Sequence, residues 1–146
     1  MVWKWNKGQA TSVARDLGDP TMTTEYRLCI YDGTGSLKMD LAVPAGGTCS
    51  GKPCWKQTQK GFKYKDKLGT SAGVTGLTLQ AGVDGKAKIG ATGKGVNLIV
   101  PMLPLNQTNP VRVQLINSTT TACWEASYLG PPTSRPGDTK WKDKND

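Results

Sequence analysis

The chain has 146 residues, a formal net charge of +8 and no histidine. A chain of this length is expected to form one domain. The lack of histidine excludes serine–histidine and cysteine–histidine triads and most catalytic zinc sites. Only 36% of the residues are hydrophobic, and no apolar run approaches the roughly 20 residues of a membrane-spanning helix. We therefore expect a narrow hydrophobic core and no transmembrane segment.

The positive charge is concentrated in the middle of the chain. Residues 52–94 contain nine lysines but only Asp66 and Asp84 as acidic residues, whereas the segments on either side are nearly neutral. The 18 glycines and 9 prolines lie between regular strand-like runs. This composition favours an all-β fold with many turns over a disordered chain.

Alternating apolar and polar side chains predict strands along most of the chain. In order, the predicted strands cover 2–7, 26–32, 36–43, 61–67, 76–80, 86–91, 96–100, 111–116 and 122–128. Asp32-Gly33 and Asp84-Gly85 are hairpin-type turns between neighbouring strands. No window has apolar residues at helical spacing. The pattern predicts an all-β, two-sheet antiparallel sandwich of immunoglobulin-like or jelly-roll type, with about eight to ten strands and disulfide staples.

The sequence also suggests where the domain ends. Residues 1–130 are expected to form the sandwich, and the proline- and glycine-rich stretch 131–139 has the composition of a linker. Residues 140–146, with Trp141 between two lysines, are expected to form a terminal strand or tail able to pair with 2–7.

Four cysteines in a short chain indicate two disulfides and an oxidising, extracellular compartment, although the count alone permits three pairings. Cys49 and Cys54 are separated by four residues and can close a local loop. If 26–32 and 122–128 are antiparallel neighbours, Cys29 faces Cys123 and Arg27 faces Glu125. We therefore predict Cys29–Cys123 and Cys49–Cys54 bridges, with reduced thiols or a zinc ligand pair as alternatives.

Several short motifs occur together along the chain: Asp19-Pro20, Tyr26 to Gly33, Gly47 to Lys56, Gly61 to Asp66 and Cys123 to Ala126. In this combination the chain resembles, over nearly its whole length, a β-rich module found, sometimes in tandem, in large predicted secreted proteins of environmental bacteria. The resemblance implies an extracellular module without an established activity, and it carries over no catalytic or binding residue.

Aromatic and lysine residues alternate in several predicted strands, and two interpretations are open. Exposed rings and lysines could bind sugars or an anionic polymer, with Trp55, Lys56, Lys63, Lys65 and Trp141 as the candidate ligand-binding residues. Strict alternation instead favours aromatic rings in the core and lysines in water. Even so, the row Lys52, Lys56, Lys60, Lys63, Lys65 and Lys67 could form a basic face for an acidic glycan.

The acidic residues give weaker signals. Asp16, Asp19, Glu25 and Asp32 are grouped around one loop and form a weak calcium candidate, although turn chemistry explains Asp19 and Asp32 equally well. A catalytic carboxylate pair using Asp40 or Glu125 has no support beyond the residue types. We expect no enzymatic activity, no catalytic residue and no cofactor other than this calcium candidate.

Together these patterns predict a secreted, non-enzymatic structural or cell-adhesion module that stacks with neighbouring modules or self-associates. The alternative is a carbohydrate-binding module that uses exposed tryptophan or tyrosine rings and a lysine-rich face. An acidic glycan or another cell-surface polymer is a candidate partner, whereas nucleic acid is not expected.

Overall fold

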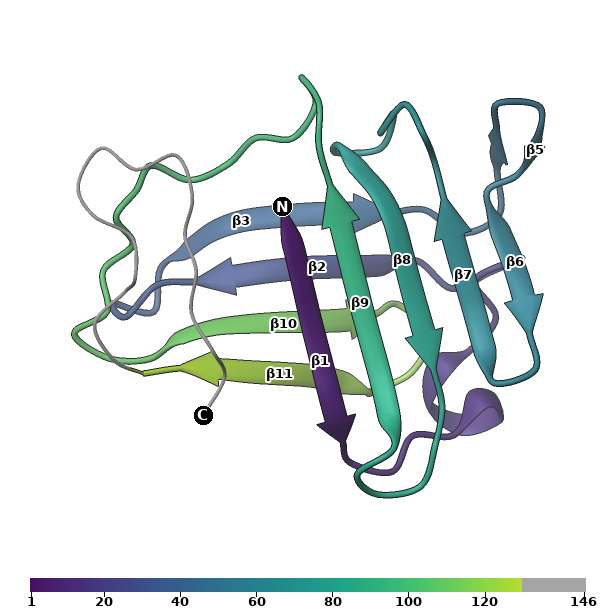
Figure 1. Ribbon diagram of the computed structural model, residues 1–146, viewed down its shortest axis with the longest axis horizontal. Coiled ribbons are helices and arrows are strands. Elements are labelled where there is room, and N and C mark those ends of the chain that lie inside the picture. Colours follow the sequence, from purple (N-terminus) through teal and green to yellow (C-terminus); the bar gives the residue numbers. More distant parts are fainter. Residues whose placement is uncertain (130–146) are drawn as a thin grey trace.

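The computed structural model describes residues 1–129 and shows two antiparallel sheets packed face to face (Figure 1). The strands are β1 (Val2–Gly8), β2 (Tyr26–Tyr31), β3 (Leu37–Val43), β4 (Thr48–Cys49), β5 (Lys52–Pro53), β6 (Trp55–Thr58), β7 (Gly61–Lys65), β8 (Val74–Gln80), β9 (Ala87–Gly93), β10 (Val111–Asn117) and β11 (Cys123–Tyr128). One short helical segment, η1 (Val13–Leu17), follows β1. The predicted all-β sandwich of two antiparallel sheets is confirmed.

The first sheet has five strands in the order β1-β9-β8-β7-β6. From β6 to β9, each strand pairs with the next one in the sequence, and β1 then adds to the outside of β9. Period-two alternation gives each strand one apolar and one polar side. In β8, for example, Leu77 and Leu79 are buried while Thr78 between them is exposed.

The second sheet has four strands in the order β11-β10-β2-β3, so β10 separates β2 from β11. The predicted direct pairing of 26–32 with 122–128 is therefore wrong. Leu28 pairs with Leu115 of β10, not with Trp124. The short connection between β10 and β11 makes these two strands a hairpin and leaves the other edge of β10 for β2. The side chains match in the predicted register as well, because any two alternating strands can match one apolar side to another.

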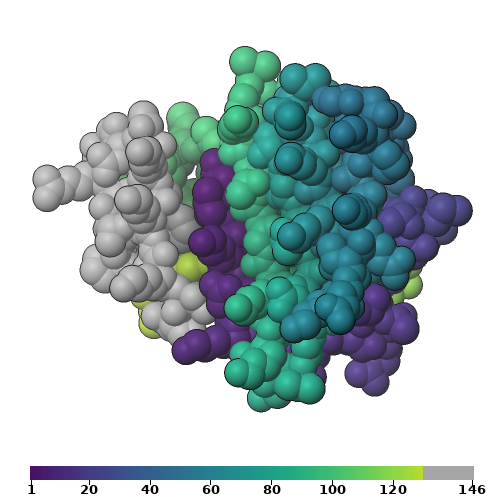
Figure 2. Space-filling model, turned by 45° about the vertical axis from the view of Figure 1, so that its right-hand side comes forward, coloured from purple at the N-terminus to yellow at the C-terminus, as the bar shows by residue number. Residues whose placement is uncertain are grey.

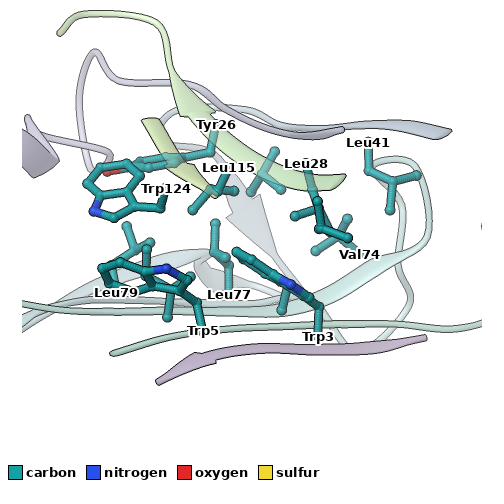
Figure 3. Packing of buried hydrophobic residues seen from close by; sticks show 14 of the residues in the cluster. Trp3, Trp5, Tyr26, Leu28, Leu41, Val74, Leu77, Leu79, Leu115 and Trp124 are labelled. Atoms are coloured by element: carbon teal, nitrogen blue, oxygen red, sulfur yellow. The ribbon is translucent and has the colours of Figure 1, made fainter. Parts of the chain in front are cut away.

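The core lies between the two sheets, whose strands cross at a steep angle in Figure 1. In Figure 3, Tyr26 and Trp124 from the four-stranded sheet lie across the core from Trp5 of the five-stranded sheet. The ring of Tyr26 lies 5.8 Å from that of Trp55 and 6.3 Å from that of Trp124. Aromatic rings in such contact bury large apolar areas and dominate the packing of a small core.

The indole N–H groups of Trp5 and Trp124, two of the buried tryptophans, have hydrogen-bond partners. Trp5 Nε1 donates a hydrogen bond to the carbonyl of Glu125 at 3.1 Å and so joins β1 to β11 across the sandwich. Trp124 Nε1 donates to Thr11 Oγ1 at 3.2 Å. These bonds satisfy two buried indole donors, whereas Trp3 Nε1 is buried without a hydrogen-bond partner among residues 1–129.

The segment between β9 and β10 differs from its prediction. Residues 96–100 form no strand, and Val96 is 99% and Ile99 81% exposed. Pro101 and Pro104 follow directly and cannot donate ladder hydrogen bonds, so the apolar run does not join a sheet. The predicted linker 131–139 and the terminal segment 140–146 lie outside the described residues.

Candidate functional site

The outer side of the five-stranded sheet carries a group of exposed lysines. They come from four strands because alternation turns every second side chain away from the core. We define the basic face as these lysines together with the small and polar outward residues between them. The lysines are Lys4 of β1, Lys88 of β9, Lys63 and Lys65 of β7, and Lys56 of β6. In Figure 2, side chains from β1, β9, β8, β7 and β6 form one continuous surface.

Strand register places several of these residues in one row across the sheet. Lys4 lies opposite Gly90, Gly90 opposite Thr78, Thr78 opposite Lys63, and Lys63 opposite Lys56. Neighbouring strands are about 4.8 Å apart, so the backbones at positions 4 and 63 are about 14 Å apart. Lysines therefore flank a centre made of glycine and threonine, where an extended ligand can lie close to the sheet.

The two sheets differ in how their charges are balanced. The five strands that carry the basic face contain no aspartate or glutamate. Among residues 1–129, none of its five lysines forms an ion pair. In the four-stranded sheet, every cation has a carboxylate partner; the pairs are Arg27–Asp40, Lys38–Asp32 and Arg112–Glu125. The net charge is therefore concentrated on one side of the sandwich.

The structure separates the predicted ligand-binding residues into two groups. Lys56, Lys63 and Lys65 lie together on the basic face. Trp55 is 3% exposed, donates a hydrogen bond to the carbonyl of Pro44 at 2.8 Å and belongs to the core, so its predicted ligand role is wrong. Trp141 lies outside the described residues.

The rest of the predicted lysine row is dispersed. Lys52 belongs to the small β4–β5 hairpin, Lys60 to the turn after β6, and Lys67 to the loop after β7. Sequence reasoning missed Lys4 and Lys88 as members of the face. Their alternation with buried residues was visible in the sequence, but only the order of the strands brings them to the same sheet.

Residues 1–129 place no aromatic ring on the basic face. Of the tryptophan, tyrosine and phenylalanine side chains in residues 1–129, only Tyr31 is not buried. Tyr31 lies on the other sheet, with the guanidinium of Arg112 5.4 Å from the centre of its ring. The described residues thus provide a cationic and hydroxyl-bearing surface without an aromatic stacking platform.

The proposed calcium ligands are not brought together. Residues 1–129 contain no group of three or more His, Cys, Asp or Glu side chains that could hold a metal ion. Asp19 Oδ1 accepts a hydrogen bond from the backbone N–H of Thr21 at 2.9 Å. Asp32 is 5% exposed, and hydrogen bonds from Thr34, with the nearby Lys38, lower its pKa to about 2. Asp19 and Asp32 stabilise turns, and among residues 1–129 the structure does not bring Asp16, Asp19, Glu25 and Asp32 together as one set of ligands.

The cysteines form one of the two predicted bridges. Cys49–Cys54 is a disulfide that closes the β4–β5 hairpin, whereas Cys29 and Cys123 are free thiols. Because β10 lies between their strands, and Cys29 and Cys123 face β10 residues two positions apart, their backbones are at least about 10 Å apart, beyond the roughly 7 Å limit for a disulfide. Burial raises the pKa of both thiols, with Asp40 adding to the effect at Cys29 and Glu125 at Cys123.

The predicted Arg27–Glu125 pair fails for the same reason. Both residues do lie on the outer side of the four-stranded sheet, but each has a nearer partner. Arg27 Nε donates to Asp40 Oδ1 at 3.0 Å on the neighbouring strand β3, and Glu125 lies 3.9 Å from Arg112.

Comparisons with known proteins found no matching protein family, no matching curated protein and no matching solved structure. In residues 1–129, no helix is sufficiently long and apolar to span a membrane.

Proposed function

We propose that this chain is a non-enzymatic, extracellular structural and adhesion module that binds an acidic polysaccharide through the basic face. The observation that carries this proposal is the charge contrast between the two sheets. Cations on one sheet are each neutralised by a carboxylate, and the five lysines on the other have none within residues 1–129. An array of unpaired, solvent-exposed lysines attracts a polyanion and concentrates it at the surface.

The chemistry of the centre of the face favours a carbohydrate over a nucleic acid. Thr78 and Thr92 offer hydroxyl groups, and Gly76 and Gly90 let a ligand approach the backbone. Nonspecific binding of single-stranded nucleic acid depends on aromatic side chains that stack the bases, and residues 1–129 place none on this face. An acidic polysaccharide needs only cations for its carboxylates and hydrogen-bonding groups for its hydroxyls.

The alternative in which sugars stack on exposed tryptophans has no support from residues 1–129. The tryptophans at 3, 5, 55 and 124 are all less than a tenth exposed. The basic face is therefore the better candidate for recognising a carbohydrate, and recognition by charge fits an adhesive role.

Binding to polygalacturonate, with uncharged dextran as the reference polymer, tests the proposal. The wild-type chain should bind polygalacturonate, and added salt should weaken the interaction because exposed charges are screened. Replacing Lys56, Lys63 and Lys65 by glutamine removes three cations of the face. Each exposed ion pair contributes about 0.2–1 kcal/mol, so the triple variant should bind about tenfold more weakly.

A control variant separates position from net charge. Lys52, Lys67 and Lys94 are exposed lysines outside the basic face, and their replacement by glutamine removes the same charge. This control should retain most of the wild-type affinity. Equal losses in the two variants, or binding to dextran as strong as to polygalacturonate, would contradict the role of the basic face.

A further inference from the structure

A hollow of about 650 Å³ lies at one end of the five-stranded sheet, between the β8–β9 loop and the segment that contains η1. Three cationic side chains, Arg15, Lys60 and Lys86, line it together with the carboxamides of Gln59 and Gln80. Residues distant in the sequence meet here because the β6–β7 turn, the β8–β9 loop and the chain after β1 all reach this end of the sheet (Figure 1). The lining is thus rich in groups that donate hydrogen bonds to an anion.

Backbone hydrogen bonds hold the walls of the hollow in place. Thr11 and Gly82 exchange two such bonds, from Thr11 N–H to the Gly82 carbonyl at 2.9 Å and from Gly82 N–H to the Thr11 carbonyl at 3.0 Å. Ala81 N–H also donates to the carbonyl of Lys60 at 2.7 Å. The loop that carries Lys86 is thereby fixed to both neighbouring segments, so the hollow exists before a ligand arrives.

Two of the three cations are available to a ligand. Arg15 lies 3.5 Å from the carboxylate of Asp16, and the other oxygen of Asp16 accepts the N–H of Ser12 at 2.6 Å. Lys60 and Lys86 form no ion pair within residues 1–129. The hollow therefore keeps two uncompensated positive charges beside one neutralised pair.

The lining also has an apolar part, formed by Ala10, Val13, Ala81 and Val83. A pyranose ring presents C–H groups on its faces and hydroxyls around its rim, and a uronic acid adds one carboxylate. Small aliphatic side chains can contact the C–H groups, carboxamides can bind the hydroxyls, and lysines can bind the carboxylate. Among residues 1–129, no aromatic ring lines the hollow, so these residues offer no side chain on which a nucleobase could stack.

The hollow is continuous with the basic face through Gln80. This residue lines the hollow, and on β8 it lies opposite Lys88, a lysine of the face. We propose that the hollow binds one carboxylate-bearing sugar residue of an acidic polysaccharide whose chain continues across the basic face. This inference rests on the proposed function and adds a defined subsite to it, so that recognition does not depend on overall charge alone.

Titration of the 15N-labelled protein with trigalacturonate, a short carboxylate-bearing sugar, tests the subsite. The backbone amide signals of Ala81, Gly82 and Lys60 should shift in a saturable way. The double variant Lys60→Gln and Lys86→Gln should bind the trisaccharide about tenfold more weakly, at about two- to fivefold per lost ion pair. The matched double variant Lys52→Gln and Lys94→Gln should bind it like the wild type.

The two proposals fail in different ways. If polygalacturonate binds in a manner that depends on the basic face, but the Lys60/Lys86 variant retains full trisaccharide affinity, the subsite is wrong and the proposed function stands. If the trisaccharide binds at the hollow but the polymer does not depend on Lys56, Lys63 and Lys65, the subsite stands and the basic face is wrong. Binding of a single-stranded oligonucleotide more tightly than polygalacturonate, with loss in the Lys60/Lys86 variant, would overturn the assignment to a sugar.

Discussion

Replacing Asp66 by asparagine tests how the loop between β7 and β8 is held at the end of the basic face. Asp66 is 1% exposed. Its carboxylate accepts hydrogen bonds from the N–H groups of Leu68 at 3.0 Å and Thr70 at 2.7 Å, and from the hydroxyl of Thr70. Burial alone would raise the pKa of Asp66, but these hydrogen bonds outweigh burial, so its pKa lies below the ordinary value of 3.8.

The expected loss of stability follows from those bonds. A hydrogen bond to a charged group contributes about 1.5–3 kcal/mol, and a buried donor left without a partner has its own cost. Asparagine keeps one acceptor oxygen but places an amide group toward at least one of the donors. We expect the free energy of unfolding to fall by about 2–3 kcal/mol, measured by urea denaturation with tryptophan fluorescence. Asp84→Asn, at an exposed turn position, is the matched control and should stay within about 0.5 kcal/mol of the wild type.

The pH dependence gives a second test of the same bonds. Because the folded-state pKa of Asp66 is lowered, its stabilising contribution is complete above the ordinary pKa of 3.8 and is lost as the pH falls toward the folded-state value. The difference in unfolding free energy between wild type and Asp66→Asn should therefore be largest near neutral pH and shrink below about pH 4. A difference below about 0.5 kcal/mol at neutral pH, or one that grows on acidification, would refute the reasoning.

Three further predictions concern the thiols, a backbone contact and the core. In the folded protein, a thiol-specific reagent should modify only the exposed Cys123, and Cys29 should react only after denaturation. Peptide mapping by mass spectrometry that finds two disulfides would contradict this assignment. Gly61→Ala should lower the free energy of unfolding by about 1–3 kcal/mol. Gly61 has φ +151°, and a Cβ there would lie 2.1 Å from the carbonyl oxygen of Leu79. An unchanged urea midpoint would argue against this clash. Leu115→Ala should lower the free energy of unfolding by about 2–5 kcal/mol, because Leu115 is fully buried. A decrease below about 1 kcal/mol would mean that the neighbouring side chains refill the space.

Much of the fold was predictable because alternation acts locally. Leu77 and Leu79 flank Thr78, and Val111 and Val113 flank Arg112, so each strand shows its buried side in its own sequence. The local Cys49–Cys54 bridge was predictable for the same reason, since its two ends are close in the sequence.

The order of the strands was not predictable, because it depends on contacts that a single strand does not encode. Tyr26–Tyr31 matches both β10 and β11 by side-chain type, and only the assembled sheet shows that β10 lies between them. That one error produced the wrong Cys29–Cys123 bridge and the wrong Arg27–Glu125 pair. A period of two identifies which side of a strand is apolar, but it does not identify the neighbour.

The candidate site was predictable only in part, for a related reason. Lys56, Lys63 and Lys65 are close in the sequence and lie on two hairpin-connected strands, so their grouping could be inferred. Lys4 reaches the same face only because β1 pairs with β9. The hollow depends on the packing of loops around Gly82, and loop packing leaves no periodic signal in the sequence.

The pairing of Lys56 with Lys63 directly across β6 and β7 gives the proposed function a thermodynamic consequence. Like charges facing each other on neighbouring strands destabilise a sheet, whereas opposite charges contribute about 0.2–1 kcal/mol. Lys56→Glu should therefore raise the free energy of unfolding by up to about 1 kcal/mol and should also weaken binding to polygalacturonate.

In the wild type, an anion bound between the two lysines would relieve their repulsion, so the polymer should raise the melting temperature more for wild type than for the variant. Lys52→Glu, in the β4–β5 hairpin, serves as the control and should change polymer binding far less. If Lys56→Glu is more stable yet binds the polymer as well as the wild type, the repulsion is real and the face is not a binding surface.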